Sequence, residues 1–209
     1  MDNRLYSFME WMYRLVYVNV LWLLFSLPVI TAIPSFYAML SIIDKWKNDE
    51  KDFAVFSQFT SECKRYFWKS YQNSLLYIII IGVLIIDFSI LRNSANESLI
   101  VISYALLTLA ALLIMVTFYA VPISVKFSLK HYKVMMLSLA LMIKQPVRSL
   151  TAIVIPIFSI ALLLVQTGFG ILFLGSFTAY FMVTATNKGL KKIYGNHPSM
   201  TSTVKPQSS

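Results

Sequence analysis

Acidic residues, charge in general and cysteine are scarce in this 209-residue chain, and each shortage excludes a class of protein. The chain has 9 Asp and Glu residues, and charged residues make up 13% of it, which is too little for the surface of a soluble domain. A single cysteine, Cys63, excludes an internal disulfide. His131 and His197 stand far apart without acidic or cysteine partners at ligand spacing, so we predict no metal site.

Motifs that carry catalysis are also missing from the chain. It has no glycine-rich phosphate loop, no nucleophile elbow and no paired carboxylates within an apolar segment. We therefore expect neither an enzyme nor a bound cofactor. The net charge of +9 could indicate nucleic acid, but the Lys and Arg residues lie beside apolar segments. Basic residues in such places anchor a chain to an anionic leaflet, so we expect no nucleic-acid partner.

Long apolar stretches are what the chain has in abundance. Hydrophobic residues make up 58% of it, and its mean hydropathy is +0.69. Five stretches are long enough to cross a bilayer: residues 15–33, 75–91, 99–125, 149–166 and 169–186. The sequence thus predicts an all-α, polytopic membrane helix bundle of about five transmembrane helices within the lipid bilayer. Residues 1–192 are expected to form a single membrane domain, and residues 193–209 a disordered tail.

Amphipathic segments separate the predicted spans. Residues 3–14, 53–72 and 134–143 are expected to be short helices lying at the membrane interface or against the bundle. In residues 53–72 an aromatic face lies opposite a basic one. We predict that Phe67, Trp68 and Lys69 of this segment form a surface for a partner protein.

The basic residues also predict an orientation. Lys and Arg are concentrated after the first, third and fifth predicted spans, whereas the other segments contain only Arg4, Arg14 and Arg92. The positive-inside rule then places the amino terminus outside and the carboxyl terminus in the cytoplasm. We therefore expect a multi-pass protein of the plasma membrane.

Two prolines lie in or near the first predicted span. Pro28 is expected to kink it, and Pro34 to begin a new helix over residues 35–47. Alternatively, residues 15–43 form a re-entrant hairpin bent at both prolines, which would move the amino-terminal arginines to the cytoplasmic side. We favour the single kinked span, because a hairpin exposes irregular backbone at membrane depth, and leave the alternative open.

Two polar residues within the spans are candidates for function. Asp87 is the sole acidic residue inside a predicted span, where it could bind a proton or a cation. It lies about a turn from the outer end, so an interfacial carboxylate reached by water or Arg92 is the simpler interpretation. Asn19 should face the bundle, because an amide in lipid needs a partner, and we favour helix-to-helix hydrogen bonding over solute binding. Gly175 and Ala179 have the spacing that lets helices approach closely.

A longer pattern runs through the first span. Starting at Asn19, the chain reads N-x-L-W-x-L-F-x-L-P-x-x-T, with Pro34 a few residues further on, and residues 67–70 read Phe-Trp-Lys-Ser. In both elements the chain resembles the YesL-like family of bacterial integral membrane proteins. The resemblance implies a plasma-membrane domain of unknown function, without established catalytic or ligand residues. It also implies an association with carbohydrate uptake, because relatives are often encoded beside such systems.

Together these observations predict a non-enzymatic accessory protein that contacts a sugar ABC-type permease. A small autonomous transporter or channel, using Asp87 and the helix broken at Pro28, is the alternative. The sequence predicts no oligomeric state.

Overall fold

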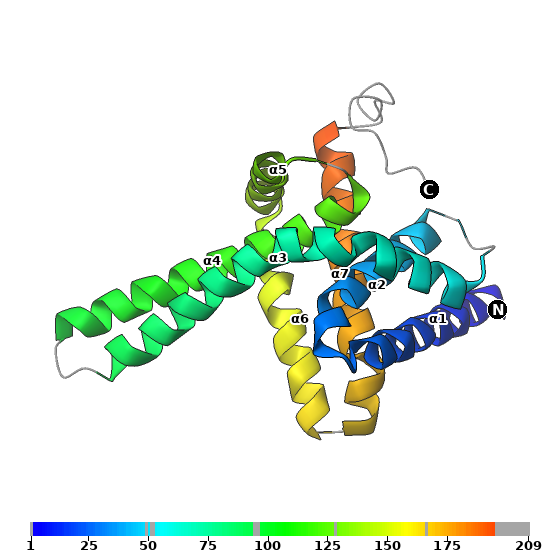
Figure 1. The fold of residues 1–209 in the computed structure, drawn as a ribbon, viewed down its shortest axis with the longest axis horizontal. Coiled ribbons are helices and arrows are strands. Elements are labelled where there is room, and N and C mark those ends of the chain that lie inside the picture. The colour runs from blue at the N-terminus through cyan, green and yellow to red at the C-terminus, as the bar shows by residue number, and fades with distance from the viewer. Residues whose placement is uncertain are drawn as a thin grey trace.

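The computed structural model describes residues 2–48, 50, 53–93, 97–127, 129–165 and 167–194. These residues form α helices and one short 3₁₀ helix, η1, so the predicted all-α class is confirmed (Figure 1). The elements are α1 (Asp2–Ser26), η1 (Val29–Thr31), α2 (Ala32–Lys47), α3 (Val55–Arg92), α4 (Glu97–Lys126), α5 (His131–Lys144), α6 (Pro146–Val165) and α7 (Thr167–Tyr194). Most of the predicted tail, from residue 195 on, lies outside the described residues.

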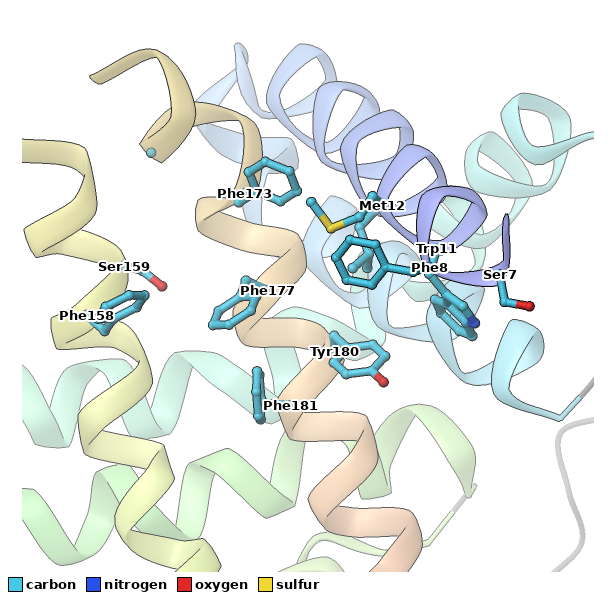
Figure 2. Close-up of a pocket in the computed structure, with 12 residues that line it drawn as sticks. Ser7, Phe8, Trp11, Met12, Phe158, Ser159, Phe173, Phe177, Tyr180 and Phe181 are labelled. Atoms are coloured by element: carbon cyan, nitrogen blue, oxygen red, sulfur yellow. The ribbon is translucent and has the colours of Figure 1, made fainter. Parts of the chain in front are cut away.

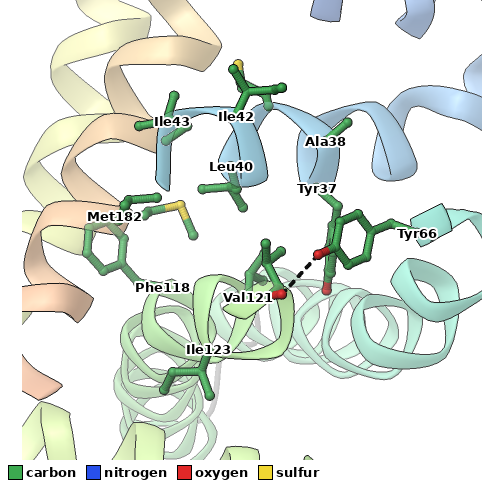
Figure 3. Close-up of a cluster of buried hydrophobic side chains, with 14 of the residues drawn as sticks. Tyr37, Ala38, Leu40, Ile42, Ile43, Tyr66, Phe118, Val121, Ile123 and Met182 are labelled. Atoms are coloured by element: carbon green, nitrogen blue, oxygen red, sulfur yellow. Dashed lines mark hydrogen bonds between the residues drawn. The ribbon is translucent and has the colours of Figure 1, made fainter. Parts of the chain in front are cut away.

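Helix α2 is the centre of the molecule. Before Asp44 it contains no charged residue and is apolar on all sides apart from two serines, and such a helix has to be buried on all sides. Helices α1, α3, α4 and α7 contact it from different directions. Figure 3 shows Tyr37 and Leu40 of α2 packed toward Val121 of α4, with Met182 of α7 alongside. Burial against four helices is what holds α2 in place.

Tyrosine hydroxyls hold the core helices in register. The Tyr66 hydroxyl of α3 donates a hydrogen bond to the Val125 carbonyl of α4 at 3.0 Å, the dashed line in Figure 3. The hydroxyls of Tyr37 on α2 and Ser74 on α3 lie 2.8 Å apart. A buried tyrosine needs such a partner, so each bond fixes one helix against the next.

Helices α1 and α2 fold back on each other as an antiparallel hairpin. The rings of Trp22 and Phe36 lie 6.3 Å apart near the turn, and those of Trp11 and Trp46 lie 6.5 Å apart at the other end. The favoured single kinked span is therefore wrong, and the hairpin alternative describes the backbone. Folding back lets α1 cover one side of α2. As expected, Pro34 lies in the first turn of α2, where its missing N–H costs nothing.

Two predicted helix breaks are absent. Helix α1 already begins at Asp2, so residues 3–14 are its first half and not a separate interfacial helix. Helix α3 is continuous over 38 residues, roughly 57 Å at the usual rise, and joins the predicted interfacial helix to the predicted second span. No proline occurs within it, and its one glycine, Gly82, does not break it. The short helix expected at residues 134–143 is confirmed as α5.

Two helical hairpins leave the core in different directions (Figure 1). The α3–α4 hairpin projects away from the rest of the molecule, and the α6–α7 hairpin points elsewhere. Among the described residues, two helices, Val55–Arg92 and Ser98–Lys126, are long and apolar enough to cross a membrane. Only 6% and 17% of their most apolar windows are buried within the chain. The five-span bundle is not confirmed, in part because the first predicted span is divided between α1 and α2.

Candidate functional site

Asn19 joins the first helix to the last. Its side chain is fully buried and makes three hydrogen bonds with the backbone of α7. The amide nitrogen donates to the Ile171 carbonyl at 2.7 Å, and the amide oxygen accepts from the N–H groups of Gly175 and Ser176 at 3.1 and 3.0 Å. The expectation that Asn19 faces the bundle is confirmed, and these bonds place it as a helix-to-helix contact.

A glycine makes this contact possible. A Cβ atom at Gly175 would lie 2.6 Å from a ring carbon of Trp22 and 3.0 Å from Oδ1 of Asn19. Any side chain there would push α1 away from α7. Ala179, one turn further along α7, is also fully buried. The small residues at this spacing thus allow the close approach that the sequence predicts.

The turn between α1 and α2 is held by side chains. The Thr31 hydroxyl donates to the carbonyls of Phe25 and, at 2.8 Å, Pro28, which closes the backbone where α1 ends. The Tyr71 hydroxyl of α3 donates to the Ile30 carbonyl, so the tip of the hairpin contacts α3. Irregular backbone at membrane depth was the objection to a hairpin, and these bonds answer part of it.

Exposed apolar side chains surround this turn. Leu27, Val29 and Ile30 of the hairpin tip all point outward, and the neighbouring α3 contributes Trp68, which is 76% exposed. The Phe67 ring packs edge-on against both Trp68 and Tyr71. We call Leu27, Val29, Ile30, Phe67, Trp68 and Tyr71 the tip surface.

Of the predicted partner residues, two thus lie on the tip surface and the third lies beside it. Phe67 is half-buried, and Lys69 is half-buried with its ammonium 5.9 Å from the Tyr66 ring centre. Trp68 is therefore the member of the trio most available to a partner.

A polar cluster joins α2, α4 and α7 at their carboxyl ends. Asp44 accepts a hydrogen bond from the Asn187 amide at 2.7 Å and lies 3.5 Å from the Lys126 ammonium. Lys126 in turn donates to the Asn187 carbonyl oxygen at 2.9 Å. A small cavity of about 10 Å³ adjoins this cluster, and the buried Thr186 hydroxyl that lines it has no partner among the described residues. That volume is close to the minimum for one water molecule.

A second ionic cluster lies between α2 and α3. Glu62 is almost completely buried, and its carboxylate accepts hydrogen bonds from Lys45 at 2.8 Å and Gln58 at 2.9 Å. Arg65 lies 3.7 Å from its other oxygen. The amphipathic pattern of residues 53–72, with an aromatic face opposite a basic one, did not predict this pairing. The sequence did offer one signal for this ion pair. Lys45 lies at the end of the apolar helix α2, and Glu62 is the one glutamate of the next helix, α3.

Basic and aromatic side chains gather at the open end of the α1–α2 hairpin. The Lys47 ammonium lies 4.0 Å from the ring centre of Tyr180 and 5.9 Å from that of Trp11, and the Arg14 guanidinium lies over Trp46. Burial lowers the pKa of Lys47, and the nearby positive charge of Lys188 lowers it further. The hairpin therefore brings Arg14 to the same end as the lysines.

An apolar groove of about 450 Å³ runs between α1, α6 and α7. Figure 2 shows Phe8, Trp11 and Met12 of α1 on one side, and Phe173, Phe177, Tyr180 and Phe181 along α7. Phe158 of α6 borders the other side. We call this the aromatic groove. Two of its walls come from opposite ends of the chain, so sequence reasoning could not identify it.

Asp87 remains a prediction without structural support. It lies half-buried in the projecting part of α3, more than a turn before the helix ends at Arg92. Among the described residues it forms no hydrogen bond or ion pair, and Arg92 lies instead over the Phe88 ring at 5.9 Å. The described residues also contain no group of three His, Cys, Asp or Glu side chains that could hold a metal ion.

Comparison with known proteins agrees with the sequence pattern. The profile of the family described as "protein of unknown function, DUF624" matches residues 15–88. Two proteins of Bacillus subtilis (strain 168) are similar over nearly the whole chain. YesL is 26% identical over 194 residues, 91% of both chains, and YteU is 25% identical over 208 residues, 97% of this chain and 93% of its own. The resemblance to the YesL-like family is confirmed.

Other comparisons add little about function. YesV of the same organism is 28% identical over 130 residues, 61% of this chain and 62% of its own. YesL, YteU and YesV are all described as uncharacterized proteins. No solved structure matches the chain.

The matched segment of this YesL-like chain has a clear structural meaning. Residues 15–88 contain the second half of α1, η1, all of α2 and most of α3, which include the tip surface and the Glu62 cluster. Within the YesL-like pattern, Asn19 and Trp22 of α1 pack against α7, and Phe25 packs against Phe59 of α3. The Thr31 hydroxyl closes the turn after Pro28 by its hydrogen bond to the Pro28 carbonyl. Each of these pattern residues therefore has a packing role.

Proposed function

We propose that this YesL-like chain is a non-enzymatic accessory protein of the bacterial plasma membrane that contacts a sugar ABC-type permease. The link to carbohydrate uptake comes from the family resemblance. The structural observation that supports a partner is the tip surface, where Tyr71 of α3 contacts the exposed turn of the α1–α2 hairpin and Trp68 lies exposed on the same helix. An exposed apolar surface that includes a tryptophan is typical of an interaction site.

The α3–α4 hairpin supports a partner within the membrane. Its apolar side chains are mostly left uncovered by this chain, so lipid or another protein has to cover them. The tip surface lies on the same helix α3, nearer its amino end. A permease could therefore contact the chain along α3 from Trp68 into the apolar arm.

The arrangement of charges supports a cytoplasmic carboxyl terminus. The Asp44 cluster joins the carboxyl ends of α2, α4 and α7. Four lysines lie at these ends: Lys45, Lys47, Lys126 and Lys188. Arg14, predicted to lie outside, is at this end as well. A multi-pass orientation with this basic end in the cytoplasm follows the positive-inside rule. A fluorescent protein fused to the carboxyl terminus should then fold and fluoresce in cells, whereas a dark fusion would contradict the orientation.

The accessory role is tested by purification of the full chain from native membranes. After cross-linking and mild-detergent extraction, mass spectrometry should recover a sugar permease or its ATPase at near-stoichiometric level. Trp68→Ala should weaken this recovery most, and Phe67→Ala to a smaller degree because its ring is half-buried.

Two surface variants away from the tip surface serve as controls. Tyr132→Ala on α5 and Val147→Ser on α6 remove exposed apolar side chains of similar kind. They should leave recovery unchanged. Recovery of the permease with Trp68→Ala at the level of the controls would exclude the tip surface, and recovery of the chain alone would contradict the accessory role.

A small autonomous transporter is the second candidate. It is favoured by Asp87, which lies half-buried in the apolar arm of α3, because an ionisable residue within an apolar span is a candidate for proton or cation binding. The purified chain in liposomes should then move a sugar or an ion, and Asp87→Asn should slow that movement. Absence of flux across a broad panel of solutes would exclude this function.

A further inference from the structure

The aromatic groove has the dimensions and lining of a ligand site. Its volume of about 450 Å³ lies within the range of about 300–1,000 Å³ that small-molecule sites occupy. Phe8 and Phe158 on its two rims are 62% and 56% exposed, so the groove opens sideways. An open apolar slot of this kind suits a flexible hydrocarbon chain.

Positive charge lies beside this groove. Tyr180 and Trp11 line it, and the Lys47 ammonium rests against both rings. Lys188 directly follows Asn187 of the Asp44 cluster on α7, and its positive charge contributes to the lowered pKa of Lys47. Lys47 therefore places a positive charge against the aromatic wall of the groove.

Nearby acidic groups are already engaged. Asp44 is held by Asn187 and Lys126, and Glu10 pairs with Arg14. Among the described residues neither Lys47 nor Lys188 forms an ion pair. Asp44 favours the charged form of Lys47 without forming an ion pair with it, and an anion bound at the Lys47 ammonium would stabilise that charge further.

We propose that the aromatic groove binds an anionic phospholipid, with an acyl chain along Phe8, Phe158 and Phe177 and the phosphate at the Lys47 ammonium. The apolar slot requires the hydrocarbon chain, and the Lys47 ammonium beside it requires the negative headgroup. A neutral lipid or an apolar helix would satisfy only the first requirement. The site is separate from the tip surface, so it does not depend on the proposed accessory role.

Competition between two lipids tests the headgroup. The full chain in a non-ionic detergent is mixed with equal amounts of phosphatidylglycerol and phosphatidylcholine, and the retained lipid is counted by native mass spectrometry. We expect one phosphatidylglycerol per chain. Lys47→Gln should weaken its retention about fivefold, the usual effect of one lysine near an anionic lipid surface. Lys133→Gln, an exposed lysine on α5, should not change it.

Two further variants test the groove. Phe8→Ser and Phe158→Ser alter mostly exposed side chains, so circular dichroism should show an unchanged helix content. Both should weaken retention of phosphatidylglycerol, and glycerophosphoglycerol, the headgroup without chains, should not compete for the site. Equal retention of the two lipids, or equal behaviour of Lys47→Gln and Lys133→Gln, would overturn the headgroup site. Unchanged retention in both phenylalanine variants would overturn the groove as the site of the acyl chain.

Discussion

Removing the Asn19 amide should lower the stability of the fold, because this side chain forms hydrogen bonds between the first helix, α1, and the last, α7. Asn19→Ala deletes three hydrogen bonds to Ile171, Gly175 and Ser176. A net value of about 1 kcal/mol applies to each such bond in a protein. Between helices in a membrane the average is lower, about 0.6 kcal/mol. The variant should thus lose roughly 2–3 kcal/mol.

A loss of this size is easily measured. For a chain of about this length, each kcal/mol lowers the melting temperature by about 2–4 °C, so Asn19→Ala should melt roughly 4–12 °C below the parent chain. Circular dichroism in a mild detergent follows the transition. Asn93→Ala, which changes an exposed residue at the carboxyl end of α3, is the matched control and should stay within about 2 °C. If Asn19→Ala melts with the control, the amide does not hold α1 to α7.

Three further predictions concern other contacts. Gly175→Ala should lower the free energy of unfolding by about 1–3 kcal/mol, because its Cβ overpacks against the Trp22 indole. Adding Trp22→Leu to this variant should recover part of the loss. If the melting-temperature changes of the two substitutions simply add, the contact is contradicted. Glu62→Gln should cost about 1–3 kcal/mol, because the bond from Lys45 loses its charged acceptor, and an unchanged melting temperature would contradict that pairing. Because the pKa of Lys47 is lowered from 10.5, the unfolded chain binds more protons between the lowered pKa and pH 10.5. The melting temperature should thus rise with pH in this window relative to Lys47→Gln, and parallel curves for the two chains would refute the effect.

Local rules predicted the helices well and their junctions poorly. Apolar length identified α4 and α5 nearly to their ends, and proline chemistry located the break at Pro28 and the start of α2. It could not tell a kink from a reversal, since a proline permits both. The reversal is decided by side chains far away, which bury α2 from four directions.

Long-range pairing also explains what sequence reasoning missed at the site. Asn19 could be recognised as a buried amide, but its partners are backbone groups, which carry no mark in the sequence. Trp68 was chosen because it lies in an aromatic-rich helical segment, and its role in binding a partner stays a prediction. The hairpin tip beside it was not chosen, because it reaches α3 through the bond from Tyr71 to Ile30.

The Asn19 contact has a consequence for how the chain is made. Its partner Gly175 lies 156 residues downstream, so at about 5–20 residues per second a ribosome needs roughly 8–30 s to deliver it. Until then α1 and α2 have emerged without α7, which supplies the partners of the Asn19 amide and covers one face of α2. An insertase, a chaperone or lipid has to shelter the hairpin during this interval. Chains cut short before α7 should therefore be substrates for membrane quality control, even though they contain the complete family-matched segment.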